Sequence, residues 1–226
     1  MMRIILSVFL LFVAPWAHAQ TPPSTADVAG YRGLHLAAHE GDADAIRRLS
    51  ASGADVDARD RAGRTPAHVA AFASNEAALR ALAEAGADVN ALENRAYDVL
   101  TIAAVADDPD LVSLAMELGN RPDRITSVYD GTALIAAAHL GHHEAVRRLI
   151  AGGAPLDHVN NLGWTALMEA VVLGDGGQDH VATVRVLVEA GADTEIPDRD
   201  GVTPLQHAEA RGYDEIAAII RAALGR

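Results

Sequence analysis

Apolar and polar residues alternate along most of the chain in short blocks that have the spacing of helices. One type of block opens on Thr and runs into an Ala-rich stretch, as in residues 65–71, Thr-Pro-Ala-His-Val-Ala-Ala. A second type carries its apolar residues on one helical face, as at Val146, Leu149 and Ile150. The pattern predicts pairs of short amphipathic helices separated by polar loops.

The blocks that open on Thr recur at a nearly fixed interval. Counting two variants that open on Arg32 and Asp98 instead of Thr, they start at positions 32, 65, 98, 132, 165 and 203, so that the steps are 33, 33, 34, 33 and 38 residues. A period near 33 is typical of a solenoid, in which each unit buries its apolar face only against its neighbours. Chains of this kind usually bind other molecules rather than transform them.

The ends of the predicted helices carry capping residues. Thr followed by Pro, as at Thr65 and Pro66, supplies an N-cap oxygen and a first-turn residue that needs no donor. Nine residues after the Thr position, a Gly suits the left-handed turn that ends a short helix. These glycines are Gly41, Gly141, Gly174 and Gly212. A second set closes the following helix, namely Gly53, Gly86, Gly153 and Gly191.

This combination of period and caps resembles the ankyrin repeat, and the resemblance covers roughly residues 27–224. It implies an all-α repeat solenoid of stacked helix-turn-helix units with connecting β-hairpin loops. We expect residues 27–226 to form six repeats, of which the first and last act as caps. The resemblance also implies that His35 and His68 are structural, hydrogen-bonded residues of the repeat.

The third unit departs furthest from the pattern. It has Asp98-Val99 in place of Thr-Pro, Asp107 in place of the first Gly, and Gly119-Asn120 in place of Gly-Ala. One extra residue precedes Thr132. We therefore expect a distorted hairpin after this unit, and we expect the unit to be the least stable part of the stack, because a missing cap costs about 0.5–2 kcal/mol.

Residues 1–19 have a different composition. Arg3 is followed by an apolar run from Ile4 to Val13 and by Ala17-His18-Ala19, which together predict a secretory signal peptide cleaved before Gln20. A membrane anchor is the alternative, but the apolar run is about half the length that a bilayer requires. We expect residues 20–26 to form a flexible lead and the protein to be periplasmic.

Composition narrows the functional classes. The chain has no Cys, which excludes disulfides and thiolate chemistry. All 18 basic residues are Arg, against 31 acidic residues, for a net charge of −13, or −14 once Arg3 is removed. This balance argues against nucleic acid and anionic lipid as partners. Phosphate-loop, nucleophile-elbow and zinc-protease motifs do not occur in the sequence, so we expect a non-enzymatic protein without a cofactor.

The residues least fixed by the repeat are the candidates for binding. In ankyrin proteins the partner usually meets the hairpin tips and the inner face of the first helices. The tip residue just before the Thr position is aromatic or basic in four units, and a further Tyr occurs in the hairpin before Thr132. These residues are Tyr31, Arg64, Tyr97, Tyr129 and Trp164. Such side chains are enriched at binding hot spots, because they combine a large apolar body with a polar end.

The inner-helix positions extend this surface. Seven or eight residues after the Thr position, the middle units carry Phe72, Val105, Leu140 and Leu173. We interpret them, together with the tips, as an apolar groove with a polar rim that binds a protein or peptide. The alternative is that the inner residues pack between repeats and that the tip aromatics lie on neighbouring hairpins.

The fifth unit contains an insertion around residues 174–180, next to the corresponding loop of the fourth unit. His142, His143, Asp175, Asp179 and His180 lie in these two loops. Imidazoles and carboxylates are a reasonable ligand set for a divalent metal.

Taken together, the repeat pattern, the predicted signal peptide and the tip residues favour a monomeric, periplasmic protein-binding module. The alternative is a metal-binding or stress-protective accessory protein that uses these loops.

Overall fold

The computed structural model describes residues 20–225, and within them every regular element is a helix. The predicted signal peptide lies outside the described residues. The helices are α1 (Thr25–Gly30), α2 (Gly33–Glu40), α3 (Ala43–Ala51), α4 (Pro66–Phe72), α5 (Glu76–Glu84), α6 (Val99–Val105), α7 (Pro109–Glu117), α8 (Ala133–Leu140), α9 (His143–Ala151), α10 (Ala166–Val172), α11 (Gln178–Glu189), α12 (Pro204–Arg211) and α13 (Asp214–Leu224).

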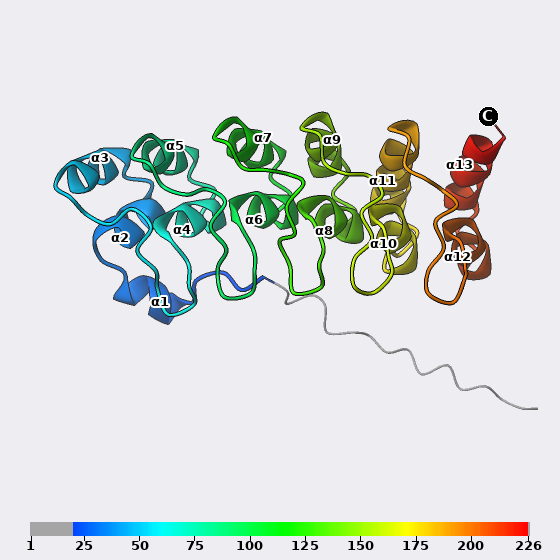
Figure 1. Cartoon of the computed structure of the whole chain (residues 1–226), viewed down its shortest axis with the longest axis horizontal. Coiled ribbons are helices and arrows are strands. Elements are labelled where there is room, and N and C mark those ends of the chain that lie inside the picture. Colours follow the sequence, from blue (N-terminus) through cyan, green and yellow to red (C-terminus); the bar gives the residue numbers. More distant parts are fainter. Residues whose placement is uncertain (1–19, 226) are drawn as a thin grey trace, which may run out of the picture.

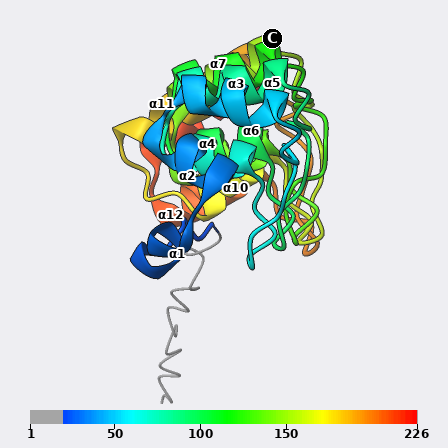
Figure 2. The same ribbon diagram turned by 90° about the vertical axis from the view of Figure 1, so that its left-hand side faces the viewer.

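From α2 onward the helices form two layers (Figure 1). The inner layer runs through α2, α4, α6, α8, α10 and α12, and each of these helices packs against the next. The second helix of each pair forms the outer layer. The loops between pairs project together from one side of the stack (Figure 2). This all-helical solenoid confirms the predicted fold class.

The predicted caps are present at the start of the inner helices. The side chains of Thr132, Thr165 and Thr203 accept hydrogen bonds from backbone N–H groups of the first turn. At α4, the Thr65 N–H donates to Nδ1 of His68, whose Nε2 faces the Tyr97 carbonyl oxygen at 3.1 Å. His68 is therefore the structural residue that the repeat pattern predicts, and burial lowers its pKa to about 4.

Five of the six first-helix ends have a left-handed residue nine positions after the Thr position. Gly41, Gly141 and Gly212 fill this place as predicted, while Ser74 and Asp107 adopt the same conformation in the second and third units. The prediction for Gly174 was wrong. In the fifth unit, Gly176 has the positive φ of 73°, because the inserted residues move the turn two positions along the chain.

One hydrogen-bonding device recurs in the loops between helix pairs. A polar side chain accepts from two backbone N–H groups of the same turn, as when Oδ1 of Asp60 accepts from Ala62 and Arg64. The equivalent side chains are those of Glu93, Ser127, Asn160 and Asp198. The hairpin after the third unit is distorted as expected. Its closing bond joins Thr126 N–H to the Gly131 carbonyl, one residue wider than the bond from Asn160 to Trp164.

The first helix of the third unit has the N-cap that we expected to be missing. Asp98 caps α6 by accepting from the N–H and hydroxyl groups of Thr101, at 2.9 and 2.8 Å, so the cap is not missing. The irregularity lies instead in the outer layer. Helices α3 and α5 pack closely, as do α7 and α9, whereas contact between α5 and α7 is sparse and includes an ion pair between Arg80 and Glu117.

The N-terminal segment is more ordered than the predicted flexible lead. Ser24 forms a capping box with Asp27, so that residues 25 and 26 belong to α1. Before α1, the Thr21 carbonyl accepts from Arg64 at 3.4 Å and its hydroxyl accepts from Arg95 at 3.2 Å. The segment thus runs along the side where the inner helices meet the hairpins, from the middle of the stack back to α2 (Figure 1).

Candidate protein-binding surface

The predicted row of tip residues divides into a buried and an exposed part. Tyr31, Arg64 and Tyr97 are 6%, 3% and 4% exposed, so they are not free surface groups in this structure. Trp164 is partly exposed and Tyr129 is 37% exposed. The difference arises because residues 20–31 cover the first hairpins and leave the later ones open.

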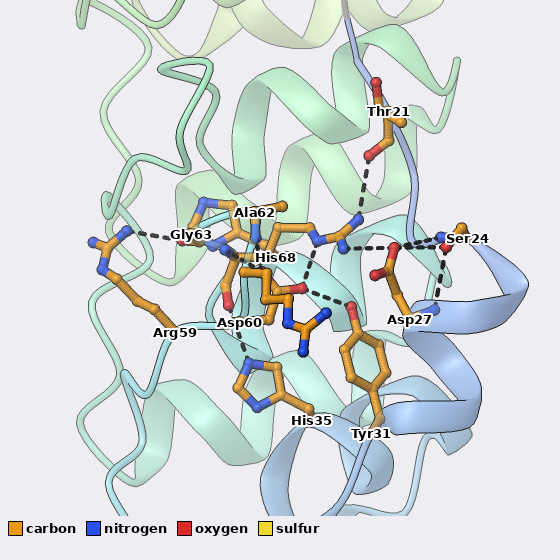
Figure 3. Close-up of polar contacts among 12 residues, drawn as sticks. Thr21, Ser24, Asp27, Tyr31, His35, Arg59, Asp60, Ala62, Gly63 and His68 are labelled. Atoms are coloured by element: carbon orange, nitrogen blue, oxygen red, sulfur yellow. Dashed lines mark hydrogen bonds and ion pairs between the residues drawn. The ribbon is translucent and has the colours of Figure 1, made fainter.

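Asp60 lies in a polar network with Tyr31 and Asp27 (Figure 3), in which Arg64 is its charged partner. Nε of Arg64 donates to Oδ2 of Asp60 at 2.7 Å, and its Nη2 lies 3.1 Å from Oδ2 of Asp27. The Tyr31 hydroxyl donates to the same Asp60 oxygen at 2.9 Å. Since Oδ1 of Asp60 accepts from the Ala62 and Arg64 backbone N–H groups, the carboxylate has partners on both of its oxygens.

The network shifts the pKa values of its members. Hydrogen bonds from the Ser24 backbone and side chain, together with Arg64, lower the pKa of Asp27 to about 2. Burial opposes ionisation of Asp60, but hydrogen bonds from Arg64 and Tyr31 still lower its pKa. Burial and the bond to Asp60 raise the pKa of Tyr31. These residues therefore fasten the N-terminal segment to the first two repeats.

The inner-helix candidates retain part of their surface. Phe72, Val105 and Leu173 are partly buried, and Leu140 is 37% exposed. Phe72 packs against the core cluster, which agrees with the alternative that inner residues contribute to the stack. Leu140 and Val105, in contrast, line a pocket that opens between α6 and α8.

An apolar patch that the sequence analysis missed lies on two neighbouring hairpins. Ile125 and Val159 are 50% and 45% exposed, and each directly precedes the residue that closes its hairpin. Val128 is 55% exposed beside Tyr129. The hairpins are bonded to each other, because Asn161 donates to the carbonyl groups of Tyr129 and Val128. The sequence signal that could have revealed this patch is the pair of aliphatic residues, Ile125 and Val159, at equivalent positions of two successive hairpins.

The pocket next to this patch has a volume of about 140 Å³. Its apolar wall includes Tyr97, Val105, Tyr129, Ile135 and Leu140, and Gln20 reaches it from the N-terminal segment. Its polar residues include Asn160, His139 and Glu169. The structure thus brings together four of the predicted inner and tip candidates, Tyr97, Val105, Tyr129 and Leu140, with a buried carboxylate that the sequence analysis did not single out.

The polar groups of the pocket form a chain of hydrogen bonds. Nδ2 of Asn160 donates to Oε1 of Glu169 at 2.7 Å. Oε2 of Glu169 lies 3.1 Å from Nδ1 of His139. Glu169 is 5% exposed, so its carboxylate is held at the bottom of the pocket.

The loops proposed for metal binding lie side by side, as expected, but their ligands do not converge. A Cβ atom on Gly141 would be 3.3 Å from Cβ of Asp179. Nδ1 of His142, however, faces the Ala104 carbonyl at 3.0 Å, and His143 contacts Glu144. Within residues 20–225, three His, Asp or Glu side chains nowhere gather in a group that could hold a metal ion.

Both ring nitrogens of His180 contact oxygen atoms of the protein. Its Nδ1 lies 2.9 Å from Oδ1 of Asp175, and the Gly177 backbone N–H together with this His180 contact lowers the pKa of the Asp175 carboxyl group. Its Nε2 lies 3.1 Å from the His139 carbonyl. His207 is likewise paired with a carboxylate, that of Asp198, at 2.7 Å. The insertion therefore folds back onto α8 and presents no open ligand set.

These features define an ankyrin-repeat solenoid with an apolar surface in its middle units. The family model for ankyrin repeats in three copies matches residues 8–95 and 100–198. The chain therefore belongs to the ankyrin repeat family. Domains of this family generally mediate protein–protein interaction and are typically non-enzymatic.

Individual relatives agree with this assignment. The chain is 36% identical over 190 residues to the ankyrin repeat protein YahD of Escherichia coli K12, covering 83% of this chain and 94% of the relative. An ankyrin repeat domain from Acinetobacter baumannii AYE is 43% identical, with a TM-score of 0.79 over 84% of this chain and 96% of that one.

A further structural neighbour shows likeness of fold alone. It belongs to the complex of a predatory endopeptidase from Bdellovibrio bacteriovorus with an immunity protein. Its TM-score is 0.70 at 24% identity, covering 85% of this chain and 98% of that one.

Proposed function

We propose that the protein is an exported, periplasmic and monomeric binding module that holds a partner protein against its middle repeats. One observation carries this proposal. Of the six large apolar side chains that are exposed among the described residues, five lie between residues 125 and 159, in the third and fourth units, and the sixth is Leu224 near the C-terminus. These five are Ile125, Val128, Tyr129, Leu140 and Val159. Exposed apolar clusters of this kind mark interaction sites.

The rest of the site fits the same role. Trp164 and Tyr129 contribute aromatic groups at the tips, and Leu140 and Val105 continue the apolar surface into the pocket. A protein complex that contains the ankyrin fold, the endopeptidase with its immunity protein, supports this use of the fold. Among the described residues, no helix is long and apolar enough to cross a membrane. The divergent loop ligands do not support the metal-binding alternative.

Crosslinking in intact cells followed by mass spectrometry will identify the partner. Affinity is then measured for the double variant Val128→Asp/Val159→Asp, which should lose at least tenfold, because two charges enter the apolar patch. Leu224→Asp is the matched control, since Leu224 is as exposed as Val159 at 45% but lies outside the patch. Equal effects of the patch and control variants would overturn the proposal.

The aromatic tip is tested separately. Trp164→Ala should lower the affinity by about 2 kcal/mol while the melting temperature changes little. Arg148→Ala, on an exposed position of the outer helix α9, should leave the affinity nearly unchanged.

Export is tested by N-terminal sequencing of the periplasmic protein, which should start at or near Gln20. An intact Met1 on cytoplasmic protein would contradict this part.

A further inference from the structure

Gln20 lies where the N-terminal segment meets the pocket between α6 and α8. The residue lines this pocket, and its amide nitrogen Nε2 is buried without a hydrogen-bond partner among the described residues. A buried donor that forms no hydrogen bond is destabilising, because its bonds with water are lost and nothing replaces them. The primary amide of Gln20 is therefore poorly matched to its surroundings.

The contacts of the next residue keep Gln20 close to the pocket. The Thr21 carbonyl accepts from Arg64 at 3.4 Å, and the Thr21 hydroxyl accepts from Arg95 at 3.2 Å. Two prolines follow and restrict the backbone that leads to α1. Residues 20–24 thus follow a defined path without helix along the inner side of the stack (Figure 1).

The residues around the pocket favour a neutral occupant. Its large side chains are mostly apolar or aromatic, namely Tyr97, Val105, Tyr129, Ile135 and Leu140. The carboxylate of Glu169 is already engaged, because one oxygen accepts from Asn160 and the other lies 3.1 Å from Nδ1 of His139. An ammonium group placed here would lose water, which is costly for a charge unless a partner compensates it.

The proposed cleavage before Gln20 gives this residue a free α-amino group. The pKa of such a group is about 8, so part of it is the uncharged amine at neutral pH. Its nitrogen can attack Cδ of the same residue, because both atoms are held in one molecule at a spacing that closes a five-membered ring. The bond from the α-nitrogen to Cδ forms and the bond from Cδ to Nε2 breaks. One amine proton moves to Nε2, which leaves as ammonia, so that a neutral lactam is formed without any co-reactant.

We infer that Gln20 of the exported protein is a modification site, which cyclises to pyroglutamate and places its lactam ring in the pocket. This inference rests on the proposed function, since cleavage before Gln20 is what frees the amino group. Cyclisation removes the two groups that suit the pocket least, the charged N-terminus and the unpartnered amide nitrogen. The chain's own end then fills the pocket, and the partner contacts the exposed hairpin patch beside it, formed by Ile125, Val128, Tyr129 and Val159.

Intact-mass spectrometry of protein purified from the periplasm tests the modification. The mature protein should begin at residue 20, with a mass lower than that of the uncyclised chain by one ammonia molecule. Gln20→Asn is the matched variant, because it keeps a primary amide but could close only a strained four-membered ring. Its mass should therefore show no loss of ammonia. An uncyclised Gln20, or a mature protein that begins at another residue, would overturn the inference.

A pyroglutamyl peptidase tests whether the lactam ring occupies the pocket. The enzyme should act on the folded protein about tenfold or more slowly than on a synthetic peptide of residues 20–31 with the same end, because the ring must first leave the pocket. Leu140→Ser removes an exposed apolar side chain from the pocket wall and should raise the rate about threefold or more. Leu173→Ser is the matched control, since Leu173 has the same position one repeat later, does not line the pocket and should leave the rate unchanged.

The outcomes separate this inference from the proposed function. Equal rates on the folded protein and the peptide, or protection that survives Leu140→Ser, would overturn the inference. An uncyclised Gln20 on periplasmic protein would contradict the inference and leave export intact, whereas an intact Met1 on cytoplasmic protein would contradict both. Loss of partner binding in the Val128→Asp/Val159→Asp variant would support the proposed binding surface in each of these cases.

Discussion

The first two repeats and the middle repeats use the same tip positions for different purposes. In the first region Tyr31 and Arg64 are buried in a network with Asp27 and Asp60, beneath α1. In the middle region Tyr129 and neighbouring apolar side chains remain exposed beside a pocket. The position of a residue in the repeat therefore does not determine the role of that residue. The role depends on whether another segment of the chain covers the position.

The two regions also differ in regularity. In the second unit, the hairpin turn has Gly63 at its left-handed position, whereas Ala96 and Asp130 occupy that conformation in the next two hairpins. Unpaired buried polar atoms occur in both regions, at Oγ of Ser50 in the first and at Oδ2 of Asp98 and Oδ1 of Asn120 in the middle. The contrast therefore lies in the hairpin turns, and backbone strain of this kind concentrates at functional sites in many proteins.

Arg64→Ala should be the most destabilising of these changes. The substitution leaves Asp60 without its closest charged partner in a buried setting, and loss of one member of a buried pair costs about 3 kcal/mol or more. Urea unfolding of Arg64→Ala and Trp164→Ala gives the comparison, because Trp164 occupies the same repeat position but is partly exposed. A loss in Trp164→Ala as large as that in Arg64→Ala would show that both tips are structural.

Hydrogen exchange should locate the weakest junction. We expect amides in α7 (residues 109–117) to open at least tenfold faster than those in α9 (residues 143–151) or α11 (residues 178–189), which each have a closely packed outer helix on both sides, and this factor corresponds to about 1.4 kcal/mol. The reason is no longer a missing cap, since Asp98 caps α6. It is the sparse packing of α5 on α7, because solenoid stability depends on each interface between neighbours. Uniform protection across the three windows would contradict this expectation.

The sequence predicted the features that depend on residues within one repeat, and it did not predict the features that depend on a distant segment of the chain. The period, the Thr caps and the structural role of His68 depend on residues within one unit, and the structure confirms them. The buried state of Arg64 depends on Asp27 and Thr21, which belong to a segment outside the repeats. Repeat periodicity contains no information about where that segment lies.

The candidate site shows the same limit. Tyr129 and Leu140 were predicted from their positions, and both are exposed at the pocket. Glu169 could not be recognised, because its significance arises from Asn160 and His139, which lie 9 and 30 residues away. The metal hypothesis failed for a related reason. Side-by-side loops were correctly inferred, but the direction of His142 depends on the backbone of the preceding unit.

Asp98→Asn should stabilise the middle region at neutral pH by about 1 kcal/mol. Burial raises the pKa of Asp98, and the side chain of Asn120 lies beside it. An amide at position 98 keeps the acceptor for Thr101 and supplies a donor where an oxygen is now unpaired.

The pH dependence gives a second readout for the same variant. Because the folded-state pKa of Asp98 lies above the unfolded value of about 3.9, folding favours the protonated form. The wild-type protein therefore loses stability as the pH rises from the unfolded to the folded pKa. The advantage of Asp98→Asn should grow over that range and stay constant above it. An advantage that does not change with pH would show that ionisation of Asp98 is not the cause.

Ala96→Gly should give the smallest gain, about 0.5–1 kcal/mol. Ala96 has a φ of 67° at the turn position where the second, fifth and sixth units have Gly63, Gly163 and Gly201. A left-handed Ala is strained by about 1–2 kcal/mol, and part of the relief is offset by the greater backbone entropy of unfolded Gly. Gly201→Ala is the matched control, because a Cβ atom there meets nothing within 4 Å and only the φ of 78° opposes it. Thermal unfolding should therefore move in opposite directions for the two variants. If both substitutions lower the melting temperature, the left-handed Ala is not a source of strain, and the irregularity of the middle repeats rests on Asp98 and the α5–α7 junction alone.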